Sequence, residues 1–494
     1  MTRYTTLLFF VVLAAMTGAR ALSVDNARPG GLEAIVAAPS DVVSLAVAGS
    51  IDASDFEFIS REMLSLRSLD LSAARISAYD GEPINDVRHY RANTLPAMLM
   101  AGSGVAEFRF PASLEAIDDG ALAGTAIEEV DLPSSVKSVG AGAFAGCTAL
   151  RAARLGGASL GAGAFAGCTA LKSVATEAAV LPERCFSGCS ALESVHAPAA
   201  GALGARVFEG CKSLRAFDFP GKLATVGERA FACSGLESAD MSQCRMLASV
   251  GAGAFASCGS LRVLAFPDKA VDAGHALAMG STGLQSVLMP DGPLPAYALA
   301  GDVSADATGA LSRASEVGEY ALQGVSGASG VRLPASLEYL GDGAMEGMTG
   351  LRHIDASALE RVPELGEDVW SGVRQGEVVL QTSDEMADAF LAAGQWQEFK
   401  ISTSGTTSVG EEVGVGQIRV WFEGMVLMAE YRGVAAVKSL RLHDTAGRLL
   451  AILTLTPDGR AAADTSRWTE RIYVVSVLDT DDNNLTTIKI ARNG

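Results

Sequence analysis

The chain has 494 residues, with 38 Lys plus Arg against 57 Asp plus Glu and a formal charge of −19. This charge argues against nucleic-acid binding, because neutralising phosphates requires clustered basic side chains. A hydrophobic fraction of 49% excludes a disordered polyampholyte, whereas 4 Trp and 5 His leave few residues for a catalytic or metal site.

The first segment has the features of a secretory signal peptide. Arg3 precedes an apolar stretch from Leu7 to Met16, and Ala19 and Ala21 are small residues at the positions that signal peptidase recognises. We therefore predict that residues 1–21 are removed on export. The stretch is too short to cross roughly 30 Å of hydrocarbon, and no other segment approaches the ~20 apolar residues required. The alternative is an N-terminal helix retained in the core.

A sequence repeat dominates the middle of the chain. Ala-Phe-Ala-Gly-Cys occurs at 143–147 and again at 164–168, which gives a period of 21 residues. One apolar marker residue can then be assigned to each of about twelve units, at intervals of 21 to 24 residues. The markers are Met98, Leu122, Phe144, Phe165, Phe186, Phe208, Phe231, Phe255, Leu277, Leu299, Leu322 and Met345.

Each unit contains a short string of alternating apolar and polar residues, such as 150–155 and 192–197, about six residues after its marker. Such alternation is typical of a strand with one buried face. A unit of this length cannot bury its own apolar face, so the units must stack, with each strand parallel to its neighbour. Glycines such as Gly140 and Gly142 allow close approach of adjacent coils and positive φ. The predicted fold is mainly β, a solenoid of stacked units.

The string Leu-Pro-Ser-Ser-Val-Lys-Ser-Val-Gly-Ala-Gly-Ala-Phe-Ala-Gly-Cys at 132–147 resembles the leucine-rich repeat of BspA-like bacterial surface proteins. The resemblance covers the predicted solenoid, residues 96–356. Within the predicted N-terminal cap region, residues 22–95, the strings 55–63 and 69–72 are similar to the region that those proteins place before their repeats. Residues 357–401, with Trp370, Trp396 and Phe399, resemble their closing unit. An uncapped stack would expose core and strand edge to water.

Five cysteines lie three residues after a marker, so stacking should place them in one buried column of free thiols: Cys147, Cys168, Cys189, Cys211 and Cys258. An occasional disulfide remains open as the alternative, because Cys185, Cys233 and Cys244 lie outside the column. No His is placed to activate a thiol.

Motifs for other chemistry are not found. The five histidines are scattered, and Asp479, Asp481 and Asn483 lack the Gly and the distal Glu of a calcium loop. Residues 140–146 have the wrong spacing for a dinucleotide loop. We predict no catalytic residues, no metal, no cofactor and no enzyme activity.

The chain changes character after residue 401. Residues 402–416 are rich in Gly, Ser and Thr, as in a linker, and residues 417–494 contain short β-runs separated by turn signals, which predict a small Ig-like β-sandwich. The strings at 437–449, 471–477 and 487–492 resemble the C-terminal sorting domain of proteins exported by the type IX secretion system. That resemblance implies that the protein comes from a Gram-negative cell of the Bacteroidetes type and that residues 417–494 interact with the secretion machinery. The alternative is a generic adhesive sandwich.

The favoured function is that of a secreted or cell-surface binding protein, which the BspA-like resemblance implies is adhesin-like and contacts host matrix or other cells. The alternative is a structural spacer of the cell envelope without a discrete ligand. The predicted ligand face comprises outward strand residues, namely Arg109, Glu129, Asp131, Arg154, His196, Asp218 and Asp240. It lacks the Trp and Tyr that anchor tight interfaces, so modest, salt-sensitive binding is expected.

Overall fold

The computed structural model describes residues 20–301, 305, 307–403, 413–415, 418–423, 425–431, 437–444, 448–456, 459–466, 468, 472–479 and 484–491. The chain divides into two compact units, Met1–Pro220 and Gly221–Gly494, and each is described by itself. The predicted Ala19, the calcium-like Asp481 and Asn483, and most of the predicted linker lie outside the described residues.

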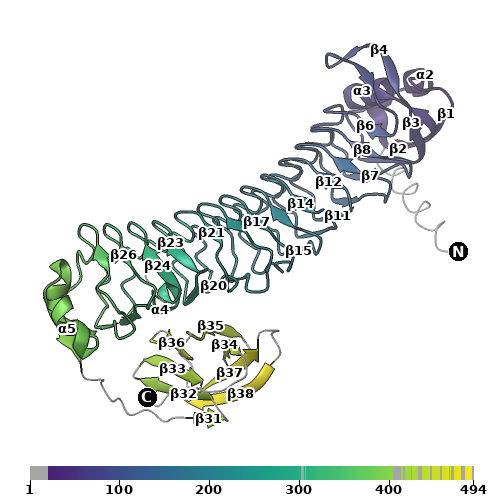
Figure 1. Cartoon of the computed structure of the whole chain (residues 1–494). Coiled ribbons are helices and arrows are strands. Elements are labelled where there is room, and N and C mark those ends of the chain that lie inside the picture. The colour runs from purple at the N-terminus through teal and green to yellow at the C-terminus, as the bar shows by residue number, and fades with distance from the viewer. Residues whose placement is uncertain are drawn as a thin grey trace. The chain divides into compact units, whose positions relative to one another are not determined.

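The first unit begins with a cap built on a parallel sheet (Figure 1). Its strands are β1 (Arg20–Asn26), β2 (Val42–Ile51), β3 (Ser68–Ile76) and β7 (Glu107–Arg109), in the order β1-β2-β3-β7. The short elements α2 (Leu32–Ile35) and η1 (Pro39–Asp41), the helix α3 (Ala53–Glu62) and the hairpin of β4 (Tyr79–Ile84) and β5 (Val87–Tyr90) complete it. β1 begins at Arg20, so cleavage after residue 21 would leave the rest of this strand in place.

One buried carboxylate joins the elements of this cap. The Asp55 carboxylate accepts hydrogen bonds from the main-chain N–H groups of Gly30 (2.7 Å), Leu32 (2.9 Å) and Asp52 (3.1 Å). Asp52 in turn caps α3, because its side chain accepts from the N–H groups of Ser54 and Asp55. The start of α3 is therefore tied to the loop that precedes α2.

Two parallel ladders follow in the first unit (Figure 1). The long ladder contains β9 (Glu129–Asp131), β11 (Ala152–Gly156), β13 (Ser173–Thr176) and β15 (Ser194–His196). The short ladder contains β6 (Thr94–Leu95), β8 (Ala116–Ile117), β10 (Ser138–Val139) and β12 (Ser159–Leu160), and the pair β14 (Val180–Leu181) and β16 (Ala202–Leu203) has the same form. Each coil thus has a second strand that the sequence did not predict.

The second unit repeats this arrangement. Its long strands are β18 (Ser238–Asp240), β20 (Val263–Ala265) and β22 (Ser286–Leu288), then β25 (Gly330–Arg332), β27 (His353–Asp355), β29 (Val379–Gln381) and β30 (Lys400–Ser402). Its short strands are β17 (Thr225–Val226), β19 (Ser249–Val250) and β21 (Asp272–Ala273), then β23 (Gly292–Leu294), β24 (Ala314–Val317), β26 (Tyr339–Leu340) and β28 (Glu364–Leu365). The short helix α4 (Ala307–Leu311) lies between β23 and β24 in the chain.

A column of buried residues fills the centre of the coils, as the marker pattern predicted. In the first unit Phe144 stacks on Phe165 with ring centroids 5.0 Å apart and an interplanar angle of 6°, and Phe186 stacks on Phe208 at 5.7 Å. The N–H groups of successive markers donate to the carbonyl just before the next marker, as from Phe144 to Ala164 (2.8 Å) and from Phe165 to Cys185 (2.9 Å). The parallel stack predicted from the repeat is confirmed.

Two marker assignments are wrong. Met98 is 56% exposed, whereas Met100 is fully buried and precedes Gly102 as Leu122 precedes Gly124. In the second unit the N–H of Phe255 donates to the carbonyl of Leu277, which makes the following residue, Ala278, the marker. In the first case two methionines compete for one position, and in the second the larger of two buried neighbours, Leu277, was chosen in place of Ala278.

The end of the solenoid is covered by aromatic residues. Between β28 and β30 the chain forms η2 (Gln375–Glu377), α5 (Asp384–Leu391) and η3 (Gly394–Glu398). Trp396 lies edge-on to Trp370 (5.2 Å) and Phe390 (5.3 Å), and its indole N–H donates to the Pro363 carbonyl (3.0 Å). Trp370 itself continues the marker column, because the N–H of Met345 donates to the carbonyl of residue 369 (3.1 Å).

The C-terminal strands form two four-stranded antiparallel sheets. One has the order β31 (Val413–Val415), β32 (Ile418–Glu423), β33 (Val426–Tyr431) and β36 (Arg460–Asp464), and the other has the order β35 (Leu449–Thr454), β34 (Val437–His443), β37 (Ile472–Asp479) and β38 (Asn484–Ala491). Val420, Leu427, Leu440, Tyr473 and Val475 lie in the shared core, so the region is a β-sandwich.

Candidate functional site

The long ladder of the first unit places its outward residues in two rows. The register sets Asp131 beside Arg154, then Ala175 and His196, and it sets Glu129 beside Ala152, Ser173 and Ser194. The residues between the rows point inward and are buried, namely Val130, Ala153, Val174 and Val195. Since parallel strands of equal register align their side chains, three of the predicted ligand-face residues lie in one row.

The other four residues of the predicted ligand face do not lie in the row of Asp131. Glu129 is exposed in the second row, and Arg109 lies on β7, where its guanidinium is 3.7 Å from the Asp70 carboxylate. Asp218 is exposed but belongs to no strand. Asp240 lies on β18 of the second unit and is half-buried, with its carboxylate 3.9 Å from Arg441 Nη2. The predicted face is therefore not one continuous surface of equivalent residues.

Exposed charge also occurs on the short ladder. Lys137, which directly precedes β10, donates a hydrogen bond to the Glu115 carboxylate, and this bond lowers the pKa of the Glu115 carboxyl. An exposed pair of this kind contributes little to stability. The pair provides exposed charges beside a different ladder from the one that carries Asp131 and Arg154.

The cysteine column is a ladder of hydrogen bonds between coils. Each Sγ donates to the marker carbonyl of the preceding coil: Cys147 to Leu122 (3.1 Å), Cys168 to Phe144 (3.1 Å), Cys189 to Phe165 (3.2 Å), Cys211 to Phe186 (3.2 Å) and Cys258 to Phe231 (3.0 Å). All eight cysteines are free, and seven are buried. The thiols thus act as polar donors, a role that the predicted apolar column did not include.

The electrostatics of these thiols disfavour nucleophilic chemistry. Burial raises the pKa of Cys211 to about 12 and that of Cys244 to about 11. For Cys147, the hydrogen bond with Cys168 and then burial raise the pKa further. Because the thiolate is the reactive form, these residues remain protonated near neutral pH. Cys233 is the exposed exception.

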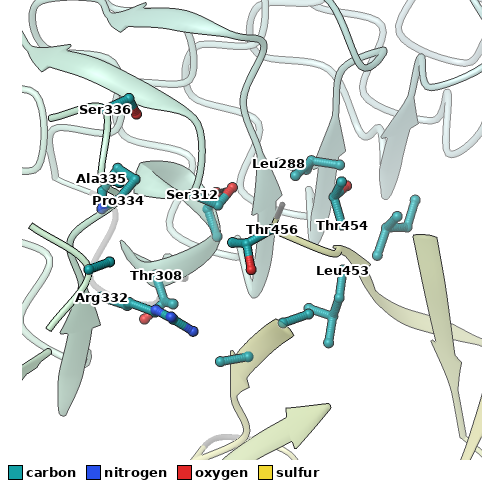
Figure 2. A pocket seen from close by; sticks show the side chains of 15 residues that line it. Leu288, Thr308, Ser312, Arg332, Pro334, Ala335, Ser336, Leu453, Thr454 and Thr456 are labelled. Atoms are coloured by element: carbon teal, nitrogen blue, oxygen red, sulfur yellow. Dashed lines mark hydrogen bonds between the residues drawn. The ribbon is translucent and has the colours of Figure 1, made fainter. Parts of the chain in front are cut away.

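A cavity of about 270 Å³ lies in the second unit between the solenoid coils and the β-sandwich (Figure 2). It is lined mainly by apolar atoms of residues such as Leu288, Pro334 and Leu453. Its hydroxyls already donate to the main chain: Ser312 to Gly309 (2.8 Å), Thr308 to Gly330 (3.3 Å) and Ser336 to Ala314 (2.8 Å). The Arg332 guanidinium is 3.5 Å from the Asp355 carboxylate. These polar groups are therefore engaged within the protein rather than aimed at a ligand.

The sequence analysis missed the apolar outward residues of β20 and β22. Val263 and Ala265 occupy the strand positions that Glu129 and Asp131 occupy on β9, and they are buried. The sequence did indicate this burial, because the string Arg262-Val-Leu-Ala-Phe266 has no polar residue between its apolar ones. The second signal was the run 449–453, which is apolar at every position and so has apolar side chains on both faces of β35.

Within the described ranges, no group of three or more His, Cys, Asp or Glu side chains is arranged to hold a metal ion. In the same part of the chain, no helix combines the length and apolar character needed to cross a membrane.

Comparison with protein families points to the repeats. Residues 98–193 and 158–285 match the BspA type leucine rich repeat region, with six copies. Over the matched residues the solenoid is thus similar to repeats of this type, and its fold is that of a leucine-rich-repeat solenoid. Among curated proteins, none matches the chain significantly.

The chain resembles several solved structures. A leucine-rich repeat protein from Bacteroides ovatus is 18% identical, with a TM-score of 0.50 over 74% of this chain and 85% of that chain. A leucine rich cell surface protein from Faecalibacterium prausnitzii is 16% identical, with a TM-score of 0.29 over 52% of this chain and 84% of that one. The pneumococcal vaccine antigen PcpA is 13% identical, with a TM-score of 0.26 over 78% and 84%. At these identities the first likeness supports the fold alone.

Proposed function

We propose that this chain is a secreted or cell-surface binding protein that recognises proteins of the host matrix or of other cells through the long ladder of its first unit. The observation that carries the proposal is the exposed row of Asp131, Arg154 and His196 on three strands of one parallel ladder. The match to BspA type repeats supports it, because leucine-rich-repeat solenoids commonly present such a sheet face to protein partners.

A charge swap tests this proposal while keeping the net charge constant. Full-length protein with Asp131→Arg and Arg154→Asp should be captured on immobilised extracellular matrix at least about fivefold more weakly than the unchanged protein, because complementary charges select the partner. The matched control is Glu115→Lys with Lys137→Glu, which swaps an exposed pair on the short ladder. Equal capture of all three proteins would reject the long ladder as the binding face.

A structural spacer is the second candidate. Small residues separate the charges in both rows, with Ala175 between Arg154 and His196, and with Ala152 and Ser173 after Glu129. A solvated sheet face without a ligand would have the same composition. In that case the unchanged protein would show no saturable capture on matrix or on bacterial cells.

We further propose that residues 1–21 direct export and that residues 417–494 act as a sorting domain for passage across the outer membrane. The support is the string order at 437–449, 471–477 and 487–492, together with the antiparallel pairing of β34, β37 and β38, the strands that these strings form. This proposal places the protein outside the cell or on the outer-membrane surface of a Gram-negative bacterium, as a partner of the secretion machinery.

Two experiments test the sorting role. Deleting residues 417–494 should leave signal-processed protein in the periplasm, which protection from protease added to intact cells would reveal. Because that deletion could alter folding, the second experiment joins residues 402–494 to an unrelated periplasmic reporter, which should then become accessible outside the cell. A reporter that stays in the periplasm would contradict the sorting role.

A further inference from the structure

The long ladder of the second unit contains an apolar patch, made of Val263, Ala265 and Leu288. These residues occupy outward positions on β20 and β22, and each is at most 4% exposed. On β15 of the first unit, the corresponding outward residues Ser194 and His196 are exposed. Because outward strand residues normally face water, something must cover the patch.

The cover is the C-terminal β-sandwich. Ile452 of β35 packs with the apolar patch in a cluster distinct from the sandwich core, and Leu449 packs partly against it. The main-chain N–H of Ile452 also donates to Ser286 Oγ on β22 (3.2 Å). Figure 2 shows Leu288 of β22 and Thr454 of β35 lining the cavity beside this contact.

Charged groups surround the patch. Arg441 of β34 approaches Asp240 of β18 at 3.9 Å. Arg313, whose side chain is 10% exposed, lies 3.1 Å from Asp268 and donates a hydrogen bond to Thr454 Oγ1 (2.8 Å). The solenoid side of this contact is therefore an apolar centre bordered by Asp240 and by the paired Arg313, and the sandwich side supplies the aliphatic side chain of Ile452 and the guanidinium of Arg441.

The contact has the features of one that opens. The sandwich contributes Ile452 and part of Leu449 to the apolar cluster, and the Arg441–Asp240 pair remains partly exposed on both sides. The adjoining cavity leaves part of the boundary unpacked. Polar-edged contacts between domains of one chain, with unpacked space beside them, open at a lower free energy than a continuous core.

We propose that the C-terminal sandwich is a removable cover over the long ladder at β18, β20 and β22. While it is docked, it hides the apolar patch and engages Asp240, one of the predicted ligand-face residues, through Arg441. When it is released, this surface becomes available to a protein that offers an aliphatic side chain next to an arginine, as Ile452 and Arg441 do. The ligand-binding consequence rests on the proposed function, whereas the cover itself does not.

Thiol labelling of the full chain tests the cover without a ligand. In a Cys233→Ser background the native thiols are buried, so Ser286→Cys provides a single reporter on the covered face. Its matched control is Ser194→Cys, the first residue of β15, which is exposed and is likewise followed by Val. We expect the Ser286→Cys thiol to react at least about tenfold more slowly than the Ser194→Cys thiol, because labelling must await release of the sandwich.

Variants on both sides of the contact complete the test. The double variant Ile452→Asp with Arg441→Glu should bring the labelling rate of the Ser286→Cys thiol to within about threefold of the Ser194→Cys rate. The control variant Met425→Asp, at an exposed position of the sandwich, should leave the labelling of the Ser286→Cys thiol slow. Leu288→Asp should have the same deprotecting effect while leaving the sandwich sequence intact, which separates release from misfolding of the sandwich.

Two results would overturn the cover: equal labelling of the two reporters in otherwise unchanged protein, or continued protection in both sets of variants. Capture of the released variants on extracellular matrix is measured separately. Rapid labelling without any matrix capture by these or the unchanged protein would contradict the proposed binding function and leave the cover standing.

Discussion

Replacing Gly161 by Ala should be among the most damaging single changes in the first unit. A Cβ at this position would lie 2.4 Å from the Ala141 nitrogen and 2.5 Å from the Gly140 carbonyl carbon of the preceding coil. Both are backbone atoms, so relief requires the two coils to separate by about 1 Å to reach an ordinary contact of roughly 3.5 Å. That separation strains the Gly161 N–Val139 O hydrogen bond, now 2.7 Å, and its neighbours.

The cost follows from these contacts. Overpacking costs about 1 to 3 kcal/mol, and each weakened backbone hydrogen bond adds about 1 kcal/mol, so the free energy of unfolding should fall by about 3 to 5 kcal/mol. Gly167→Ala, in the same coil, is the matched comparison. Its φ is +72°, but a Cβ there meets nothing closer than 3.9 Å, so only the left-handed backbone is penalised, by about 1 to 2 kcal/mol.

Urea denaturation followed by far-UV circular dichroism measures both variants against the unchanged protein. The decisive result is which variant loses more free energy of unfolding, because this distinguishes the effect of close approach between coils from the effect of backbone conformation. A Gly161→Ala variant as stable as Gly167→Ala, or more stable, would refute the argument that coil spacing at this column requires glycine.

Four further changes give predictions with the same denaturation assay. Cys168→Ala should lower the free energy of unfolding by about 1 to 2 kcal/mol, because packing and the hydrogen bond from Sγ to the Phe144 carbonyl are lost. Thiol labelling of the native protein should modify Cys233 rapidly and few of the other cysteines. Rapid labelling of most of the cysteines would contradict a buried column. Cys233→Gly should raise the free energy of unfolding by roughly 1 kcal/mol, since Cys233 has a φ of +57° at the turn position that Gly210 occupies in the preceding coil. A loss of stability would refute the strain. Trp396→Ala should cost about 3 to 5 kcal/mol, and a near-neutral result would show that the end of the solenoid needs no aromatic cover. Asp55→Ala should cost about 2 to 3 kcal/mol by leaving three N–H groups without their acceptor, and an unchanged midpoint would reject its linking role.

The sequence alone determined the repeat architecture. The recurrence of Phe144, Phe165 and Phe186 at nearly constant spacing requires units that stack, because each can bury its apolar face only against a neighbour. The same periodicity placed Cys168 inside and predicted Gly142 at positive φ, which the structure shows at +60°. Local pattern suffices here because every coil has nearly the same surroundings.

Tertiary structure decided what periodicity does not contain. Met98 and Met100 are equally apolar, and only the stacking of Gly102 with Gly124 determines which of them is inside. The burial of Val263 depends on Ile452, which is far away in the chain and belongs to another fold. Outward strand positions are set by the period, but whether they meet water or another domain depends on long-range packing, for which a local repeat carries no information.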